Sequence, residues 1–226
     1  DVDRMKVIIQ NNTFSDNYDP STDNNKNNQF HILSDKKHSE GFIVSNCSFE
    51  FSNPGSGTSC RALKFADNIH TITINTSKFI NLYSIEGAAI YIDHQDISAT
   101  ITSCSFTNLL TENPGSALLL NSMTRDIDII DCDFTDCYRT NDQISYVIST
   151  NTGLVNLHHV RFAPTSQTTS YPIYYDISNT LTLEDRIFEN VTSSLPIFEF
   201  PTITDSASIV NFVNCSIIDC YVPNYI

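Results

Sequence analysis

The residues best suited to chemistry are the carboxylates of one acidic segment, Asp126, Asp128, Asp131, Asp133 and Asp136. A polysaccharide hydrolase or lyase would need two or three carboxylates that converge in one groove to act as acid and base. The same oxygens could hold calcium, with Asp126 and Asp128 on the outer face of a strand as first candidates. The reading that we favour is a solvated acidic surface. We expect no cofactor, with calcium as the one possible ion.

A histidine pair, His158-His159, is the next group with potential metal ligands. Adjacent strand residues point to opposite faces, so the two rings cannot easily bind one ion. We therefore assign the pair no metal role.

The cysteines leave two alternatives open. Cys104 and Cys132 occupy the same position in neighbouring repeats, where Cα atoms of adjacent parallel strands lie about 4.8 Å apart, within disulfide range. Cys132–Cys137 and Cys215–Cys220 share a C-x4-C spacing that could bridge a bend. The alternative to these disulfides is a set of reduced, buried thiols, because a buried cysteine packs as a small hydrophobe.

The elements that position these groups come from an internal repeat. One apolar anchor recurs at intervals of 26 to 35 residues, at Phe14, Phe49, Phe79, Phe106, Phe134, Phe162, Phe188 and Ile217. A period in this range is typical of a solenoid.

Each anchor follows a short strand with one apolar face. The residues seven and five positions before it are all apolar, and those between are mostly polar, which is the period of two of a half-buried strand. A second strand follows, as in the segments 62–65, 89–92, 117–120, 145–148 and 197–200. The pattern predicts an all-β fold, a right-handed parallel β-helix (a pectate-lyase-like solenoid) of about eight coils.

A turn follows each anchor, and at six of the eight repeats it carries Asn or Asp two residues after the anchor. The repeated position predicts a ladder of side chains that hydrogen-bond to the turn, formed by Asp16, Asn81, Asn108, Asp136, Asn190 and Asp219. The Asn- and Asp-rich run 15–29 is predicted to be a flexible loop insertion. Residues 1–226 then form a single domain, and the lack of an initiator Met suggests an excerpt of, or a product processed from, a longer chain.

The outward positions of the second strand predict a binding surface. Our alignment places Tyr91, Leu119, Val147 and Tyr175 there as a stripe of apolar and aromatic side chains. Tyr is suited to stacking on sugars or to anchoring a protein partner. A loop or another chain that covers the stripe is the alternative.

Charge and sequons narrow the class of protein. With 26 acidic and 12 basic residues the formal charge is −14, which disfavours nucleic acid as a partner. No stretch approaches the about 20 apolar residues of a membrane span, so we expect no direct membrane insertion. Five N-x-Ser/Thr sequons are compatible with a secreted glycoprotein; they lie at Asn11, Asn46, Asn75, Asn190 and Asn214.

Several repeats resemble those of polymorphic outer-membrane-type β-helix proteins, found in chlamydiae and in protist surface families such as those of trichomonads. The segments 87–90 (Gly-Ala-Ala-Ile) and 115–118 (Gly-Ser-Ala-Leu) are similar to a Gly-Gly-Ala-Ile motif. The segments 79–81, 106–108 and 188–190 are similar to a Phe-x-x-Asn motif, one residue shorter. The resemblance implies a secreted or cell-surface protein, often adhesive, and supplies no catalytic residue.

These observations predict a non-catalytic extracellular or cell-surface β-helix, an adhesin-like or structural segment whose partner is a glycan or a host or self surface protein. The first alternative is a polysaccharide lyase or glycoside hydrolase of the parallel β-helix class. The second is a self-assembling filament subunit, because no polar cap is evident at either end and an uncapped solenoid exposes pairing edges that allow end-to-end self-association.

Overall fold

The computed structural model describes residues 5–15, 28–33, 39–52, 61–66, 69–93, 97–112, 115–121, 126–139, 147–150, 154–163, 174–176, 180–184, 187–189, 198–199 and 209–218. The regular elements of these residues are all β-strands, and every strand pair is parallel. Within the same residues no helix is long and apolar enough to cross a membrane.

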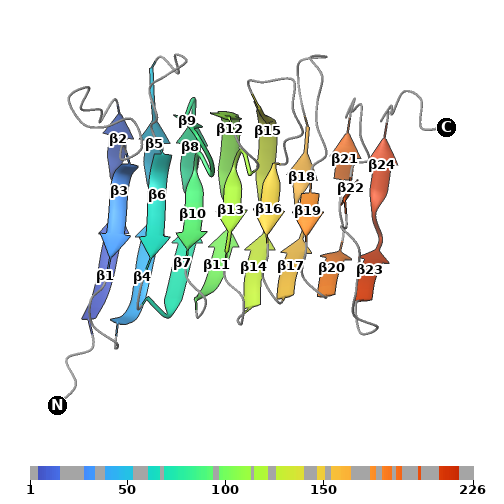
Figure 1. The fold of residues 1–226 in the computed structure, drawn as a ribbon, viewed down its shortest axis with the longest axis horizontal. Coiled ribbons are helices and arrows are strands. Elements are labelled where there is room, and N and C mark those ends of the chain that lie inside the picture. Colours follow the sequence, from blue (N-terminus) through green and yellow to red (C-terminus); the bar gives the residue numbers. More distant parts are fainter. Residues whose placement is uncertain are drawn as a thin grey trace.

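The strands form three parallel sheets that run along the long axis of the molecule (Figure 1). Sheet A has eight strands, in the order β1 (Met5–Gln10), β4 (Ser39–Ser45), β7 (Thr71–Asn75), β11 (Ser98–Thr102), β14 (Asp126–Ile130), β17 (Leu154–His158), β20 (Thr180–Glu184) and β23 (Ile209–Val213).

Sheet B has nine strands, among which β9 (Tyr83–Ser84) pairs with β12 beside the main row. The main row is β2 (Thr13–Ser15), β5 (Ser48–Glu50), β8 (Lys78–Ile80), β12 (Ser105–Thr111), β15 (Asp133–Arg139), β18 (Arg161–Phe162), β21 (Ile187–Glu189) and β24 (Ser216–Ile218). Sheet C has seven strands, in the order β3 (Asn28–Leu33), β6 (Arg61–Ala66), β10 (Ile90–Asp93), β13 (Leu118–Leu120), β16 (Ile148–Thr150), β19 (Tyr174–Asp176) and β22 (Phe198–Glu199).

The chain visits the three sheets in turn and then returns to sheet A beside its previous strand, which makes the fold a β-solenoid. The strand register confirms the sequence alignment of sheets A and B. In sheet A, Val7 pairs with Phe42, Phe42 with Ile72 and Ile72 with Ala99. In sheet B the anchors pair with one another without interruption, from Phe14 with Phe49 to Phe188 with Ile217.

The anchors build a phenylalanine stack through the interior. Ring centroids lie 5.1, 5.1, 5.0, 4.6 and 5.0 Å apart along the series Phe14, Phe49, Phe79, Phe106, Phe134 and Phe162. The three central pairs are nearly coplanar, with interplanar angles of 4°, 3° and 5°. Stacked aromatic pairs contribute about 0.5–1.5 kcal/mol each beyond the area that they bury. The stack therefore holds neighbouring coils in register.

Two sharp corners recur from coil to coil, one between sheets A and B and one just after the anchor, and left-handed backbone occurs at both. At the first corner, between sheets A and B, φ lies between 47° and 55° at Asn11, Asn46, Thr76, Ser103, Asp131, His159 and Asn214. At the second, after the anchor, φ is 55°, 52° and 52° at Asn81, Asn108 and Asp136. Asn and Asp tolerate this region better than other non-glycine residues, which explains their recurrence.

The loop insertion predicted at 15–29 overlaps two strands, because Ser15 ends β2 and Asn28 begins β3. The other residues of that run lie outside the described part of the chain. The prediction of a loop thus fails at both of its ends, where backbone pairing to the neighbouring coil extends further than the polar composition indicates.

We predict that Phe106→Ala lowers the free energy of unfolding by about 3–5 kcal/mol, as truncation of a buried Phe does. The Phe106 side chain has no exposed surface and stacks on both Phe79 and Phe134. Urea denaturation followed by circular dichroism measures the loss. Ser105→Ala is the matched control, because Ser105 is a half-buried neighbour in β12 outside the stack and should change stability by less than about 0.5 kcal/mol. Equal losses for the two variants would contradict a stack that holds the coils together.

Candidate functional site

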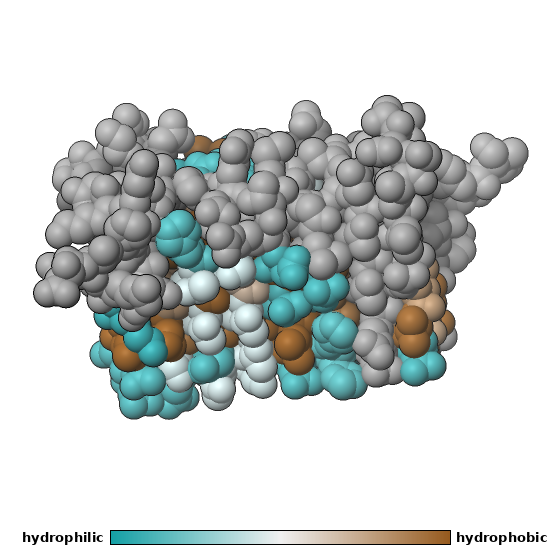
Figure 2. Space-filling model, turned by 90° about the horizontal axis from the view of Figure 1, so that it is seen from below, coloured by the Kyte–Doolittle hydropathy of each residue, from teal (hydrophilic) through white to brown (hydrophobic). Residues whose placement is uncertain are grey.

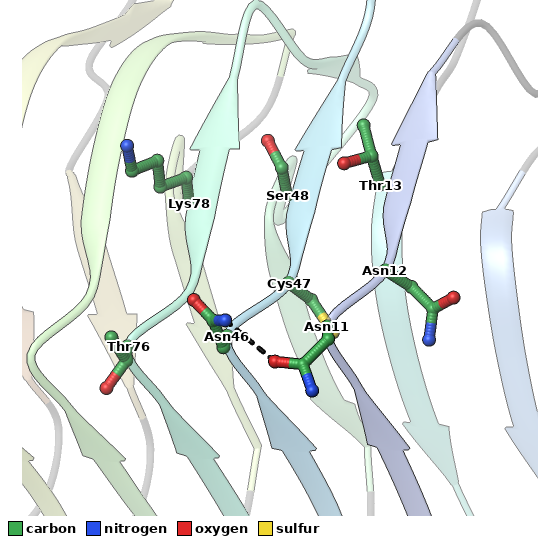
Figure 3. Close-up of a pocket in the computed structure, with 8 residues that line it drawn as sticks. All are labelled: Asn11, Asn12, Thr13, Asn46, Cys47, Ser48, Thr76 and Lys78. Carbon is green, nitrogen blue, oxygen red and sulfur yellow. Dashed lines mark hydrogen bonds between the residues drawn. The ribbon is translucent and has the colours of Figure 1, made fainter.

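A polar groove of about 360 Å³ opens at the first corner, across β2, β5 and β8. Figure 3 shows two rows of side chains, with Thr13, Ser48 and Lys78 on one side and Asn11, Asn46 and Thr76 on the other. Asn12 and Cys47 complete the lining. In each coil, the left-handed residue of the corner contributes to one row. The residue two positions later begins the strand of sheet B and contributes to the other row.

Hydrogen bonds between coils fix the lower row. Nδ2 of Asn46 donates to Oδ1 of Asn11 at 2.7 Å, drawn as the dashed line in Figure 3. The backbone N–H of Asn46 donates to the Asn75 carbonyl at 3.1 Å, and that of Thr76 to the Thr102 carbonyl at 3.0 Å. These contacts make the row part of the folded framework.

Thr76 is unusual in this row because its φ is 47°. A β-branched side chain is a genuine outlier in the left-handed region, which costs an L-residue about 1–2 kcal/mol. Strained backbone of this kind persists where the surrounding structure over-determines it, and it clusters at binding sites. Here the corner itself imposes the conformation, because the same left-handed backbone recurs at this position in the other described coils.

Lys78 is the only charged residue among the described residues that line the groove. Its side chain is exposed, and no ion pair of Lys78 is found within the described part of the chain. The other lining groups are amides, hydroxyls and one thiol. The groove can therefore donate and accept hydrogen bonds and place one positive charge against a ligand.

Beyond the groove, the side chains at the first corner change from neutral to acidic. The next coil carries Ser103 and Ser105, and the one after it carries Asp131 and Asp133. Asp131 Oδ1 lies 3.3 Å from His159 Nδ1. The corner thus runs from a neutral and cationic part at the N-terminal end to an acidic part further along.

The structure does not bring the acidic segment together as a catalytic group. Asp126 and Asp128 lie on sheet A, Asp131 and Asp133 follow at the first corner, and Asp136 lies at the second. Asp128 pairs with Thr100 on one side and Asn156 on the other, as the alignment predicts, and its Oδ1 accepts a hydrogen bond from Asn156 Nδ2 at 2.9 Å.

Charged neighbours contact two further acidic residues of the segment, Asp131 and Asp133. Asp133 Oδ1 lies 3.8 Å from Arg161, and Asp126 is exposed. Among the described residues, no three His, Cys, Asp or Glu side chains are placed to hold a metal ion. Calcium at Asp126 and Asp128 therefore lacks a third protein carboxylate in that part of the chain.

The predicted apolar stripe on sheet C is wrong at Val147. Leu119 pairs with Tyr91 and with Ser149, and Ser149 pairs with Tyr175, so the outward row passes through Ser149. β16 begins only at Ile148, three residues later than the predicted strand 145–148. The loop before this strand varies in length between coils. The alignment made from the sequence therefore placed the outward residue of β16 two positions too early.

The stripe is also not an open surface. Tyr91 is 8% and Val147 9% exposed, and Leu119 is half-buried; for Tyr175 the structure describes the backbone only. The turns before β10 and β13 explain this covering, because a Cβ at Gly87 would lie 3.1 Å from Leu119 and one at Gly115 3.2 Å from it. Both glycines have positive φ, and their turns lie against Leu119. The alternative of a covered stripe therefore applies here.

Charged groups enclose the Tyr91 ring. The Arg61 guanidinium lies 4.7 Å and the Lys64 ammonium 4.9 Å from the ring centroid. Burial, with Glu86 and Asp93 nearby, raises the pKa of Tyr91 to about 12. Arg61 is itself buried and donates to the Glu86 and Gly87 carbonyls. Tyr91 thus belongs to the packing of the solenoid.

The cysteines that the structure describes are thiols. Cys47, Cys104 and Cys132 lie one residue after the first corner, almost fully buried, and each donates to the carbonyl two residues earlier at 3.2–3.3 Å. Ser77 occupies the same position in its own coil and donates to the Asn75 carbonyl in the same way. The shared role is to close the corner from the inside.

No disulfide joins Cys104, Cys132 or Cys137. The hydrogen bond with Cys104, together with burial, raises the pKa of the Cys132 thiol, and burial raises the pKa of the Cys137 thiol. Cys215 donates to the Val213 carbonyl at 3.6 Å, and Cys220 lies outside the described residues. For the described cysteines the structure therefore has free thiols, which are buried at Cys47, Cys104 and Cys132.

One rung of the predicted turn ladder is present, as a bond between two side chains of neighbouring coils instead of a bond to the turn backbone. Nδ2 of Asn108 donates to Oδ1 of Asn81 at 2.8 Å, and Asp136 has the same left-handed backbone in the next coil. Asp16, Asn190 and Asp219 lie outside the described residues.

The sequence reasoning missed the parallel ladder at the first corner, although Asn, Asp, Ser, Thr or His stands three residues before every anchor.

The ladder at the first corner gives a structural reason for several of the sequons. Asn11, Asn46 and Asn214 all occupy the left-handed position, and the Ser or Thr that completes each sequon begins the next strand. Asn75 ends β7 and is half-buried, and Asn190 lies outside the described residues. Backbone geometry alone is a sufficient reason for three of these asparagines, independent of any glycan.

We predict that replacements of Asn108 separate its two roles. Asn108→Gly keeps the left-handed backbone and loses the amide bond to Asn81, so the free energy of unfolding should fall by about 0.5–1.5 kcal/mol. Asn108→Ala also loses the tolerance of positive φ and should be less stable than the glycine variant by about 1 kcal/mol. Urea denaturation of the two variants measures the difference, and an alanine variant as stable as the glycine variant would count against a backbone role.

Comparisons of the chain with protein-family models, with curated proteins and with solved structures find no match. The residues and their geometry are therefore the basis for any function assigned to this solenoid.

Proposed function

We propose that this chain is a non-catalytic extracellular or cell-surface β-helix that acts as an adhesin-like or structural segment. The observation that carries the proposal is the continuous parallel pairing of strands from one coil to the next in all three sheets. Such pairing makes a rod whose outer side chains recur once per coil, as in other solenoids that present extended binding surfaces.

The proposed architecture is one right-handed helix of about eight coils. Each strand of sheet A pairs with the strand one repeat later, and the connection between them passes through sheets B and C. Crossovers between parallel strands of one sheet are right-handed in about 98% of cases, which supports this hand. The eight strands of sheet A support the coil number.

The positions of the carboxylates favour a non-catalytic surface over a hydrolytic site. Asp128, Asp131 and Asp133 each contact a partner one coil away, through Asn156, His159 and Arg161. A hydrolytic pair instead needs two carboxyl groups that both face one substrate bond. Asp128, Asp131 and Asp133 are each engaged with a neighbouring coil.

We expect a panel of neutral and acidic polysaccharides, with and without calcium, to show retention of one glycan class without the release of reducing or unsaturated ends. A heat-denatured sample is the control for both readouts. Product formation above that control would refute a non-catalytic role and favour the lyase or hydrolase alternative. Retention without products would support an adhesive role.

A second candidate function is end-to-end assembly, and the observation behind it is the exposed apolar side chains of β23 and β24. Phe212 and Ile217 occupy inward positions, paired with Leu183 and Phe188, yet they are 52% and 61% exposed. Figure 2 shows apolar side chains at the right-hand end of the molecule, where β23 lies. Elsewhere along the solenoid, the next coil covers these positions. In an assembly, β1 and β2 of a second copy would cover them, since Val7, Ile9 and Phe14 occupy the same repeat positions.

Sedimentation of residues 1–226 over a range of concentrations tests assembly. We expect elongated oligomers that grow with concentration, and we expect Phe212→Lys to abolish them because an ammonium group would be buried without a partner. Lys64→Gln, on sheet C, is the control for a changed surface charge away from this end. A monomer at every concentration would exclude this candidate.

A further inference from the structure

We propose that the polar groove at the first corner binds a saccharide that carries a single carboxylate or sulfate group. The inference rests on the proposed adhesive function and names the class of ligand. The site consists of the upper row Thr13, Ser48 and Lys78 and the lower row Asn11, Asn46 and Thr76.

The lining groups match the hydroxyl groups of a sugar. Asn11 and Asn46 use one acceptor and one donor in the hydrogen bond between them. No other partner of Asn11 Nδ2 or Asn46 Oδ1 is found among the described residues, so a donor and an acceptor remain for a ligand. The hydroxyls of Thr13, Ser48 and Thr76 can each donate and accept, as can the hydroxyls of a saccharide.

The coil spacing places these groups at regular intervals. Thr13 pairs with Ser48 and Ser48 with Lys78, so the upper row rises by about 4.8 Å per coil. Because the backbone of both rows belongs to the hydrogen-bonded framework, little backbone freedom is lost on binding, which favours affinity. A groove of this build is preorganised for a ligand that extends along the solenoid axis.

Lys78 gives the groove its charge preference. Its ammonium group is the one positive charge among the described lining residues, and no lining residue is a carboxylate. In a chain with a formal charge of −14, an unneutralised lysine beside amides and hydroxyls is a local site of opposite sign. At physiological ionic strength the Debye length is about 8 Å, so a bound anionic group responds mainly to this lysine.

The same geometry limits the ligand to one anionic group. Ser105 pairs with Lys78 on one side and with Asp133 on the other, so the acidic part of the corner begins two coils beyond the lysine. A polyanion that followed the corner would meet Asp131 and Asp133. A ligand with one acidic sugar next to neutral sugars avoids this repulsion.

The size of the groove agrees with a short saccharide or the end of a longer one. Its volume of about 360 Å³ is at the lower end of the about 300–1,000 Å³ range of small-molecule sites. Such a volume suits one or two sugar residues, and the open side of the groove leaves room for the rest of a glycan chain.

Titration calorimetry with three matched probes tests the proposal: sialyllactose, which carries a carboxylate, a sulfated lactose and neutral lactose. The protein is residues 1–226 produced in a bacterial host, so that Asn11 and Asn46 carry no glycan. We expect at least tenfold tighter binding of one acidic probe than of lactose, and the stronger of the two identifies the acidic group. We expect Lys78→Gln to reduce that binding to the level of lactose and Lys78→Arg to retain it.

Lys6→Gln is the matched control, because it removes one positive charge from an exposed position on β1 outside the groove and should leave affinity unchanged. Circular dichroism verifies that each variant is folded. Three outcomes would overturn the proposal: no binding of any probe, equal binding of lactose and the acidic probes, or unchanged binding by Lys78→Gln. Cleavage of a probe during the titration would instead refute the non-catalytic function, so the two failures are distinguishable.

Discussion

Each inward side chain stacks on the side chain at the same repeat position of the next coil, and the rest of this solenoid depends on that contact. The phenylalanine series shows it most clearly, with ring centroids 4.6–5.1 Å apart. No single coil could bury its apolar face alone, because its three strands are too short to enclose a core. Burial is achieved only between coils. The order of the molecule therefore propagates along its axis, and Phe212 and Ile217 of the last described coil are exposed.

The corners follow from the same stacking. Since the strands must return to the same place in every coil, the bends before and after the anchor have to occur at the same repeat positions each time. Left-handed backbone provides the bend, and cross-coil amide bonds such as Asn46 to Asn11 and Asn108 to Asn81 stabilise it. A thiol or hydroxyl inside the first corner donates to a nearby carbonyl. Polar groups that are costly inside a core thus become part of the repeat.

The outer surface is where coils differ from one another, and function resides there. The groove combines residues from three coils that are 30 or more positions apart in the sequence, whereas the acidic segment, contiguous in sequence, is divided among sheet A and both corners. Contiguity in a solenoid therefore predicts little about proximity on the surface. Position within the coil predicts it much better, as the pairing of Asp128 with Thr100 and Asn156 shows.

The sequence by itself determined the parallel stacking of sheets A and B down to individual residue pairs, because a period of two within a longer repeat leaves only one register that buries every apolar face. The ladder at Asn81 and Asn108 followed from the same repeat. Only the tertiary structure decided the register of Val147, the covering of Tyr91 and the state of the cysteines. Loops of variable length precede the strands of sheet C, so the position of each strand cannot be found by counting residues from the anchor. Burial by a turn such as that at Gly87 depends on contacts that no single repeat encodes.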